Sequence, residues 1–151
     1  MKLTLAAVST RRTTPKNEPT ELLTQQYATR CAQYTPLDLL AFPTEAALLA
    51  ATERQPGRPA ATLILFESRG DLATSESFAS YISKLRDAGA QRILLAIGPA
   101  DGWSPTTLAR AARSFSFGRI TLPHELARAV AAEQIYRALT ILAGHPYHSG
   151  H

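Results

Sequence analysis

Two short apolar runs decide the fold of this chain: Thr62-Leu63-Ile64-Leu65-Phe66 and Ile93-Leu94-Leu95-Ala96-Ile97. Neither run alternates between apolar and polar residues, which is the pattern of a strand with one solvent-exposed face. A strand that helices cover on both faces is continuously apolar, so the two runs predict strands of a parallel sheet. The segment between them predicts a helix, because Phe78, Ile82 and Leu85 fall on one stripe of a helical period.

Strand and helix patterns alternate outward from these two runs. Further strands are expected at about 3–8, 37–42 and 120–122, and helices at about 21–33, 44–52, 75–88, 104–114 and 124–142. The expected N-caps are Thr44, Thr74 or Ser75, and Ser104. The order βαβαβαβαβα predicts an α/β three-layer sandwich with a mostly parallel sheet, and a length of 151 residues suits a single domain over 1–151.

The composition excludes several classes of protein. A hydrophobic fraction of 45% is too high for a disordered chain, and no apolar run approaches the roughly 20 residues that cross a bilayer. The opening apolar stretch is too short for a signal peptide, so we expect a cytoplasmic protein with no membrane contact. The only cysteine, Cys31, can close no disulfide within the chain and is expected to be buried. A net charge of +4 permits nucleic-acid binding without requiring it.

The last helix is apolar around most of its circumference, with Val130, Ile135, Leu139 and Leu142 among the apolar residues that spread beyond one stripe. A helix of this kind must be buried on more than one side. A second copy of the chain would bury it most easily, which predicts a homodimer. A core within one subunit, with a surplus of apolar residues, is the alternative.

Two glycine-containing turns follow the two apolar runs, at 67–70 and 98–102. Open α/β sheets bind ligands at the carboxyl ends of their strands, so both turns are candidate ligand sites. They carry neither a Walker loop nor the dinucleotide fingerprint, and ATP and NAD sites therefore lack their usual sequence marks. Taken alone, a glycine turn between a strand and a helix is more often structural than functional.

All four histidines lie late in the chain, at His124, His145, His148 and His151. The last three are evenly spaced, but a chain end without a cysteine partner predicts adventitious metal binding rather than a metal cofactor. His124 has a structural interpretation too, as an ordinary first-turn residue of the last helix.

Three motifs near the carboxyl end carry a resemblance to a known family. They are Leu122-Pro123-His124-Glu125-Leu126-Ala127-Arg128, Glu133-Gln134-Ile135-Tyr136-Arg137-Ala138 and Gly144-His145-Pro146-Tyr147-His148. Together with Gly98-x-x-x-Gly102-x-Ser104, Ser75-Glu76-x-Phe78-Ala79 and the opening Met1-Lys2-Leu3, they resemble the large-subunit ribosomal RNA methyltransferase H family of the SPOUT superfamily. The resemblance is specific over about residues 62–148 and weak before them.

The resemblance implies a fold, a cofactor and a reaction. Members of the family thread the carboxy-terminal part, here about 62–148, into a trefoil knot, and they are homodimers. They bind S-adenosylmethionine and methylate N3 of a pseudouridine in 23S rRNA of the large ribosomal subunit. By alignment, the implied cofactor-binding residues are Phe66, Glu67, Gly98, Pro99, Gly118, Arg119, Ile120, Thr121, Leu122 and Pro123.

The implied chemistry aligns N3 with the methyl group and removes the N3 proton. The predicted catalytic residues are Tyr147, His148 and Arg137. Tyr147 and His148 are expected beside the target base. Arg137 and Arg128 are interpreted as phosphate or structural partners, with ion pairs at the dimer interface as the alternative.

Two departures from the family pattern concern activity. Pro99 stands where the family usually has the second of two adjacent glycines, and proline lacks the backbone N–H that could donate to the cofactor. The region 44–59 is shortened and lacks lysines that could touch rRNA. Both changes are compatible with weakened activity or an altered substrate.

Two other functions remain as alternatives. One is a different SPOUT specificity, because the loop 97–102 also resembles SPOUT enzymes that methylate uridine N3 in small-subunit rRNA; the missing RNA-binding barrel domain argues against it. The other is a SPOUT-like rRNA-binding protein or assembly factor with lost or altered methylation activity.

Overall fold

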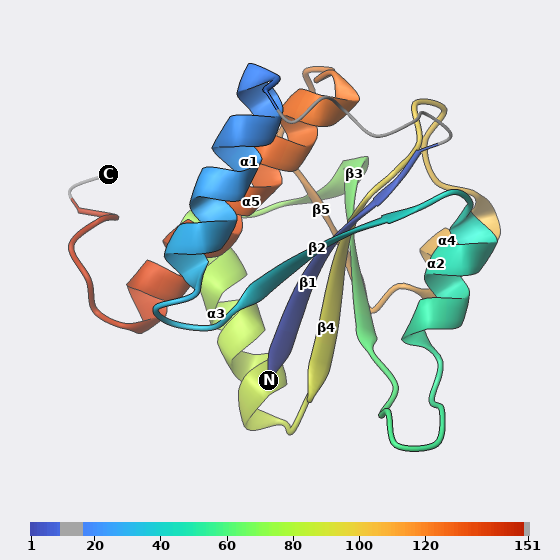
Figure 1. Ribbon diagram of the computed structural model, residues 1–151, viewed down its shortest axis with the longest axis horizontal. Coiled ribbons are helices and arrows are strands. Elements are labelled where there is room, and N and C mark those ends of the chain that lie inside the picture. The colour runs from blue at the N-terminus through green and yellow to red at the C-terminus, as the bar shows by residue number, and fades with distance from the viewer. Residues whose placement is uncertain (10–16, 150–151) are drawn as a thin grey trace.

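The computed structural model describes residues 1–9 and 17–149 (Figure 1). Strands and helices alternate along the chain, which confirms the predicted order. The elements are β1 (Lys2–Val8), α1 (Pro19–Cys31), β2 (Leu37–Phe42), α2 (Glu45–Thr52), β3 (Thr62–Leu72), α3 (Ser75–Asp87), β4 (Arg92–Ile97), α4 (Pro105–Arg110), β5 (Arg113–Ser116) and α5 (His124–Leu142).

The five strands form one sheet in the order β2-β1-β4-β3-β5, and every neighbouring pair is parallel. The two apolar runs that predict the sheet are paired with each other, with Thr62 beside Ile93 and Phe66 beside Ile97. β1 lies on the other side of β4, so strands from both halves of the chain share the sheet. The predicted α/β architecture is confirmed, with a sheet that is entirely parallel.

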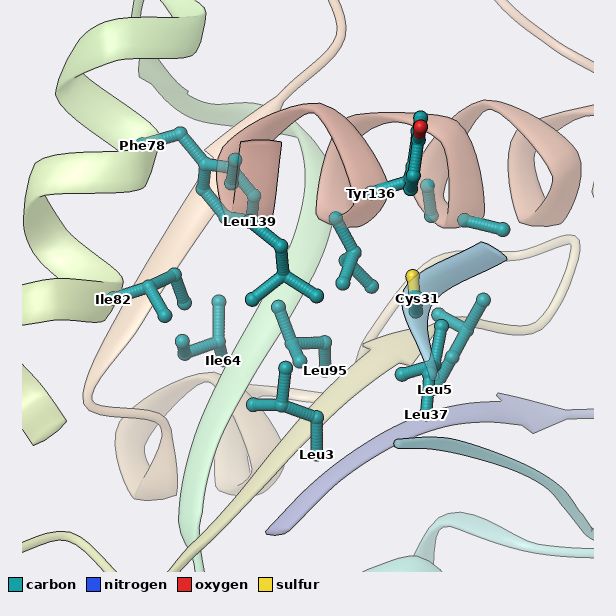
Figure 2. Close-up of a cluster of buried hydrophobic side chains, with 14 of the residues drawn as sticks. Leu3, Leu5, Cys31, Leu37, Ile64, Phe78, Ile82, Leu95, Tyr136 and Leu139 are labelled. Atoms are coloured by element: carbon teal, nitrogen blue, oxygen red, sulfur yellow. The ribbon is translucent and has the colours of Figure 1, made fainter. Parts of the chain in front are cut away.

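Helices cover both faces of this sheet: α1, α3 and α5 lie on one face, and α2 and α4 on the other (Figure 1). Alternate residues of a strand enter different cores, because successive side chains point to opposite faces. Ile64 packs in the core under α1, α3 and α5, shown in Figure 2, whereas Leu65 packs in the core under α2. Burial on both faces is the physical reason why these strands are continuously apolar.

Three helices begin at the predicted capping residues. The side-chain oxygens of Thr44, Thr74 and Ser104 each accept a hydrogen bond from the backbone N–H three residues further on, at 3.1, 3.0 and 3.4 Å. Each cap satisfies one of the amide groups that a helix leaves unpaired at its amino end.

The segment 104–122 differs from its prediction. The helix expected to reach about 114 ends at Arg110, the edge strand β5 follows at Arg113–Ser116, and residues 120–122 are not a strand. Phe115 is the one apolar residue of β5 and is buried opposite Phe66. The prediction was wrong because it extended the helix through this short strand, which four residues with one apolar side chain do not mark. Ile120 is 70% exposed, so the apolar residues of 120–122 form no buried strand.

The first glycine turn, 67–70, lies inside a strand rather than at its end. Phe66 and Asp71 both align with Phe115 of β5, so the residues between them are extruded from β3 as a bulge. Gly70 closes the bulge, and a Cβ added there would lie 2.8 Å from the backbone carbonyl carbon of Ser114. Glycine is therefore required at this position because two backbones approach each other closely.

The burial of α5 is largely achieved within one subunit, by packing against α1 and α3 (Figure 1). Most of the apolar circumference of α5 is thus covered without a second copy, although Leu126 stays exposed. The homodimer stays a prediction, as does the trefoil knot. Cys31 is fully buried at the end of α1, and burial raises the pKa of its thiol to about 12.

Among the helices of the described residues, none combines the length and the apolarity needed to cross a membrane.

Candidate functional site

The implied cofactor segments meet at the carboxyl edge of the sheet. Phe66 is paired with Ile97, the last residue of β4, and Gly98 follows directly. The carbonyl oxygen of Gly98 accepts a hydrogen bond from Nδ1 of His124, the first residue of α5, at 3.1 Å. Because a carbonyl can only accept, Nδ1 of His124 carries the proton. This bond holds the segment 118–123 next to the end of β4.

Trp103 lies between two of these segments and was missed by sequence reasoning. Its indole N–H donates to the carbonyl oxygen of Phe66 at 3.0 Å. A Cβ added to Gly98 would lie 2.8 Å from Cε2 of the same indole. The glycine at 98 therefore makes room for this ring. The available signal was a single tryptophan placed directly after a glycine turn.

A pocket of about 330 Å³ opens beside Phe66 and Gly118, which belong to two of the implied cofactor segments. Four phenylalanines form much of its wall, and none of its lining residues is cationic. Of the other implied residues, Glu67 stays in the bulge, where its carboxylate accepts the backbone N–H of Arg69 at 2.7 Å. The pocket is lined by Phe66, Leu72, Ala73, Thr74, Phe78, Phe115, Ser116, Phe117, Gly118, Val130 and Gln134. Gly98, Pro99 and residues 119–123 are not among them.

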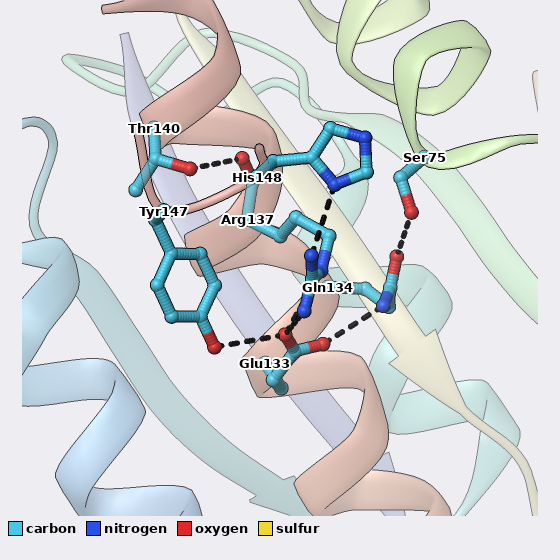
Figure 3. Close-up of polar contacts among 7 residues, drawn as sticks. All are labelled: Ser75, Glu133, Gln134, Arg137, Thr140, Tyr147 and His148. Atoms are coloured by element: carbon cyan, nitrogen blue, oxygen red, sulfur yellow. Dashed lines mark hydrogen bonds and ion pairs between the residues drawn. The ribbon is translucent and has the colours of Figure 1, made fainter. Parts of the chain in front are cut away.

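A polar cluster brings the three predicted catalytic residues together (Figure 3). Oε1 of Glu133 accepts hydrogen bonds from Nε and Nη2 of Arg137, at 3.0 and 2.7 Å, and from the hydroxyl of Tyr147, at 3.1 Å. The guanidinium of Arg137 also lies over the ring of Tyr147, 4.9 Å from its centroid. Nη1 of Arg137 lies 2.9 Å from Nδ1 of His148.

The partners of His148 fix its tautomer. A guanidinium can only donate, so Nδ1 of His148 accepts from Arg137 and carries no proton. Nε2 then carries the proton and donates to Oε1 of Glu76 in α3 at 2.7 Å. His148 is therefore neutral in this arrangement, and the chain end is attached to both α5 and α3.

The pKa shifts of three groups describe the charges around His148. The hydrogen bonds from Arg137 to Glu133 are the main cause that raises the pKa of the guanidinium further, so Arg137 remains a cation. Burial, followed by the nearby Tyr27 and Glu133, raises the pKa of Tyr147 well above its usual value, so its hydroxyl remains a donor. The hydrogen bond from His148 is the main cause that lowers the pKa of Glu76, which keeps that acceptor ionised.

Gln134 connects the polar cluster to the pocket, and sequence reasoning assigned it no role. Its Nε2 donates to Glu133 at 2.8 Å, and its Oε1 accepts from the hydroxyl of Ser75 at 2.8 Å, while the side chain lines the pocket. The signal was present in the sequence: Glu133, Gln134 and Arg137 are closely spaced polar residues in the mostly apolar middle of the helix.

Arg128 lies apart from this cluster. It forms a largely buried ion pair with Glu21 of α1, within one subunit, which favours the structural interpretation of this arginine.

Within residues 1–9 and 17–149, no group of three or more histidine, cysteine or carboxylate side chains is arranged to hold a metal ion. His145 accepts the backbone N–H of Tyr147, and His151 lies outside the described residues.

Sequence comparisons find similar proteins along nearly the whole chain. The family model described as "Predicted SPOUT methyltransferase" matches residues 1–148. The Ribosomal RNA large subunit methyltransferase H of Koribacter versatilis is 46% identical over 136 residues, which span 90% of this chain and 92% of that protein. The protein of the same name from Methylocella silvestris is 52% identical over 60% of this chain and 56% of its own length.

Solved structures share the fold at low sequence identity. The SpoU methyltransferase AviRb of Streptomyces viridochromogenes, in complex with AdoMet, matches 95% of this chain and 59% of its own with a TM-score of 0.57 and 15% identity. A protein described for 2-OH methylation of C/U34 on tRNA matches 92% of this chain and 91% of its own with a TM-score of 0.50 and 21% identity.

Proposed function

This chain belongs to the ribosomal RNA large subunit methyltransferase H family of SPOUT methyltransferases, and we propose that it transfers a methyl group from S-adenosylmethionine to N3 of a pseudouridine in 23S rRNA. The similarity to the Koribacter versatilis protein along 92% of that protein's length carries the proposal. The substrate is the large ribosomal subunit, which places the protein in the cytoplasm.

The pocket beside Phe66 suits the methyl donor. S-adenosylmethionine supplies a methyl group that is already activated by a sulfonium, and aromatic rings attract such a cation whereas a lining lysine or arginine would repel it. A volume of about 330 Å³ falls within the roughly 300–1,000 Å³ of small-molecule sites. We assign Phe66, Gly98 and residues 118–123 to hold the donor. Pro99 offers no N–H, and its carbonyl already accepts from Gly102 at 2.9 Å.

The polar cluster supplies groups for the base. Arg137 is placed to stabilise the negative charge that develops on the base as N3 loses its proton. Tyr147 keeps its proton and acts as a hydrogen-bond donor beside it. Nδ1 of His148 is the unprotonated nitrogen of the cluster, so it is the candidate proton acceptor once Arg137 turns toward the base.

Two measurements test this function. Calorimetry with S-adenosylmethionine is expected to show saturable binding, and mass spectrometry of 23S rRNA is expected to show loss of one methylated pseudouridine in a strain that lacks the gene. The control is 23S rRNA from the strain that keeps the gene, in which the methylated pseudouridine should be present. An absence of cofactor binding contradicts the proposal and favours an rRNA-binding protein without methylation activity.

The surface beside α1 and α5 supports the proposed homodimer. Leu22 and Leu23 of α1 are 56% and 40% exposed, and Leu126 of α5 is 37% exposed. The ion pair between Glu21 and Arg128 holds the two helices together, and each of the three leucines is within two residues of a member of this pair. Exposed leucines that cluster on neighbouring helices are typical of a protein interface.

We expect the double substitution Leu22→Glu with Leu126→Glu to convert the dimer to a monomer, because it buries two carboxylates in the contact. Sedimentation velocity should show the dissociation constant raised by about 100-fold or more, roughly 3 kcal/mol. Leu108→Glu is the matched control, since Leu108 is 40% exposed on α4, across the sheet. An unchanged mass of the double variant contradicts the assigned interface.

The path of the chain after β5 supports a threaded carboxy-terminal part over about 62–148. β5 lies beyond β3 at the edge of the sheet, yet His124 contacts Gly98 at the end of β4. The segment between them must cross the carboxyl end of β3, where the bulge and the connection to α3 also pass. We infer that this crossing forms the trefoil knot within a single domain; an untangled chain trace in a crystal structure would contradict it.

A further inference from the structure

We propose that Trp103 is a positioning residue for the methyl donor, because its indole sets the three cofactor-binding segments relative to one another. The inference rests on the proposed function, and nothing in the family motifs quoted above includes this side chain. Trp103 does not line the pocket. It acts through the residues that it contacts.

A tight turn brings the indole back to the end of β4. The N–H of Gly102 donates to the carbonyl of Pro99 at 2.9 Å, and Gly102 has a left-handed φ of +82°. That conformation favours glycine. The reversal places the ring of Trp103 against the backbone of Gly98, close enough that a side chain at 98 would collide with it. The second of the two glycine turns is therefore shaped around this tryptophan.

The indole N–H fixes β3 at Phe66, directly before the bulge. Its bond to the carbonyl oxygen of Phe66 is buried, and Trp103 itself is 8% exposed. A buried carbonyl without a donor is costly, so the bond holds Phe66 at a defined distance from the loop after β4. The rest of the ring packs with Leu48 and Leu65 in the core under α2. This packing anchors the indole from the face of the sheet opposite to α5.

The contacts form one connected series across the site. The carbonyl oxygen of Phe66 is hydrogen-bonded to the indole of Trp103, and this indole packs on Gly98. The carbonyl oxygen of Gly98 is in turn hydrogen-bonded to His124. Phe66 also stacks on Phe117, with ring centroids 4.7 Å apart. Trp103 thus joins the first two segments directly, and the third segment, 118–123, is held at its two ends through Phe117 and His124.

The chain has a single tryptophan, so its fluorescence reports on this position alone. We expect S-adenosylmethionine to change the emission of the wild-type protein with the same dissociation constant that calorimetry gives. No change of emission at concentrations that saturate the calorimetric signal overturns the proposal.

Trp103→Phe tests the hydrogen bond, since it keeps an aromatic ring and removes the N–H. We expect it to raise the dissociation constant and the KM for S-adenosylmethionine by about fivefold to tenfold while kcat changes less. Leu48→Ala is the matched control: Leu48 is fully buried in the same core, so this variant should lower the Tm without changing cofactor affinity.

The outcomes separate this inference from the proposed function. If the wild-type protein binds no S-adenosylmethionine in the calorimeter, the proposed function fails. If the wild type binds it and Trp103→Phe, folded by circular dichroism, binds it equally well, Trp103 is a core residue only and the inference is overturned. Equal losses of affinity in Trp103→Phe and Leu48→Ala overturn it as well, because general destabilisation would then explain the effect.

Discussion

Replacing Arg137 with glutamine is expected to lower kcat/KM for rRNA methylation by about 100-fold or more. A cation placed to stabilise developing negative charge contributes roughly 3–4 kcal/mol in a site that excludes water. Glutamine also removes the donor to Nδ1 of His148, which releases the fixed tautomer, and leaves Glu133 without its cation. The measurement is methyl transfer to ribosomes from a strain that lacks the gene, at varied S-adenosylmethionine.

Arg110→Gln is the matched control for this substitution. Arg110 is exposed and lies 3.9 Å from Glu53 in a surface ion pair, which contributes little to stability. It should leave kcat/KM within a factor of about two. A kcat/KM of Arg137→Gln within threefold of the wild-type value contradicts the assigned role. If the variant loses only its affinity for S-adenosylmethionine, Arg137 belongs to the cofactor site and does not act on the base.

Gly70→Ala is expected to destabilise the fold by about 3 kcal/mol, which corresponds to a fall in Tm of about 6–12 °C for a domain of this size. The added methyl group would lie 2.8 to 2.9 Å from backbone atoms of Ser114 and Phe115. Backbone cannot move aside as a flexible side chain does, so β5 must shift away from β3. The measurement is the free energy of unfolding in urea, followed by circular dichroism.

Ser68→Ala is the control for this prediction. Ser68 is exposed in the same bulge, and its contact with β5 is made by its backbone carbonyl, which accepts from Ser116 at 3.0 Å. We expect this variant to unfold within about 0.5 kcal/mol of the wild type. A stability of Gly70→Ala equal to that of Ser68→Ala would show that the two strands do not approach each other as closely as described.

Much of the fold was predictable because its signals are local. The continuous apolar runs at β3 and β4 predicted a two-sided parallel sheet, and the caps at Thr44, Thr74 and Ser104 marked helix starts. The errors occurred where local signals compete. Ser104 and Pro105 begin a helix strongly, but nothing nearby marks its end at Arg110, and β5 has four residues with Phe115 as their one apolar side chain, which is too little for a strand signal.

The candidate site was predictable only in part. Resemblance selected Phe66, Gly98, Arg137, Tyr147 and His148. The fold places Phe66 on the pocket wall and Gly98 against Trp103, and it gathers the other three in the cluster around Glu133. Gln134 and Glu76 were quoted within motifs yet given no role. Their importance comes from partners far away in the sequence, which no spacing rule relates to them.

By itself, the amino-acid sequence determined the order of the elements, the parallel sheet and the family, because periodicity and motifs are properties of neighbouring residues. Tertiary structure alone decided that residues 67–70 are a bulge, that the glycine at 98 accommodates Trp103, and that His148 is neutral with its proton on Nε2. The bulge and the tautomer depend on distances between atoms that are remote along the chain, and the place of Trp103 is fixed by its bond to Phe66 on another strand. Such distances are set only when both cores are packed and the buried polar groups have found their partners.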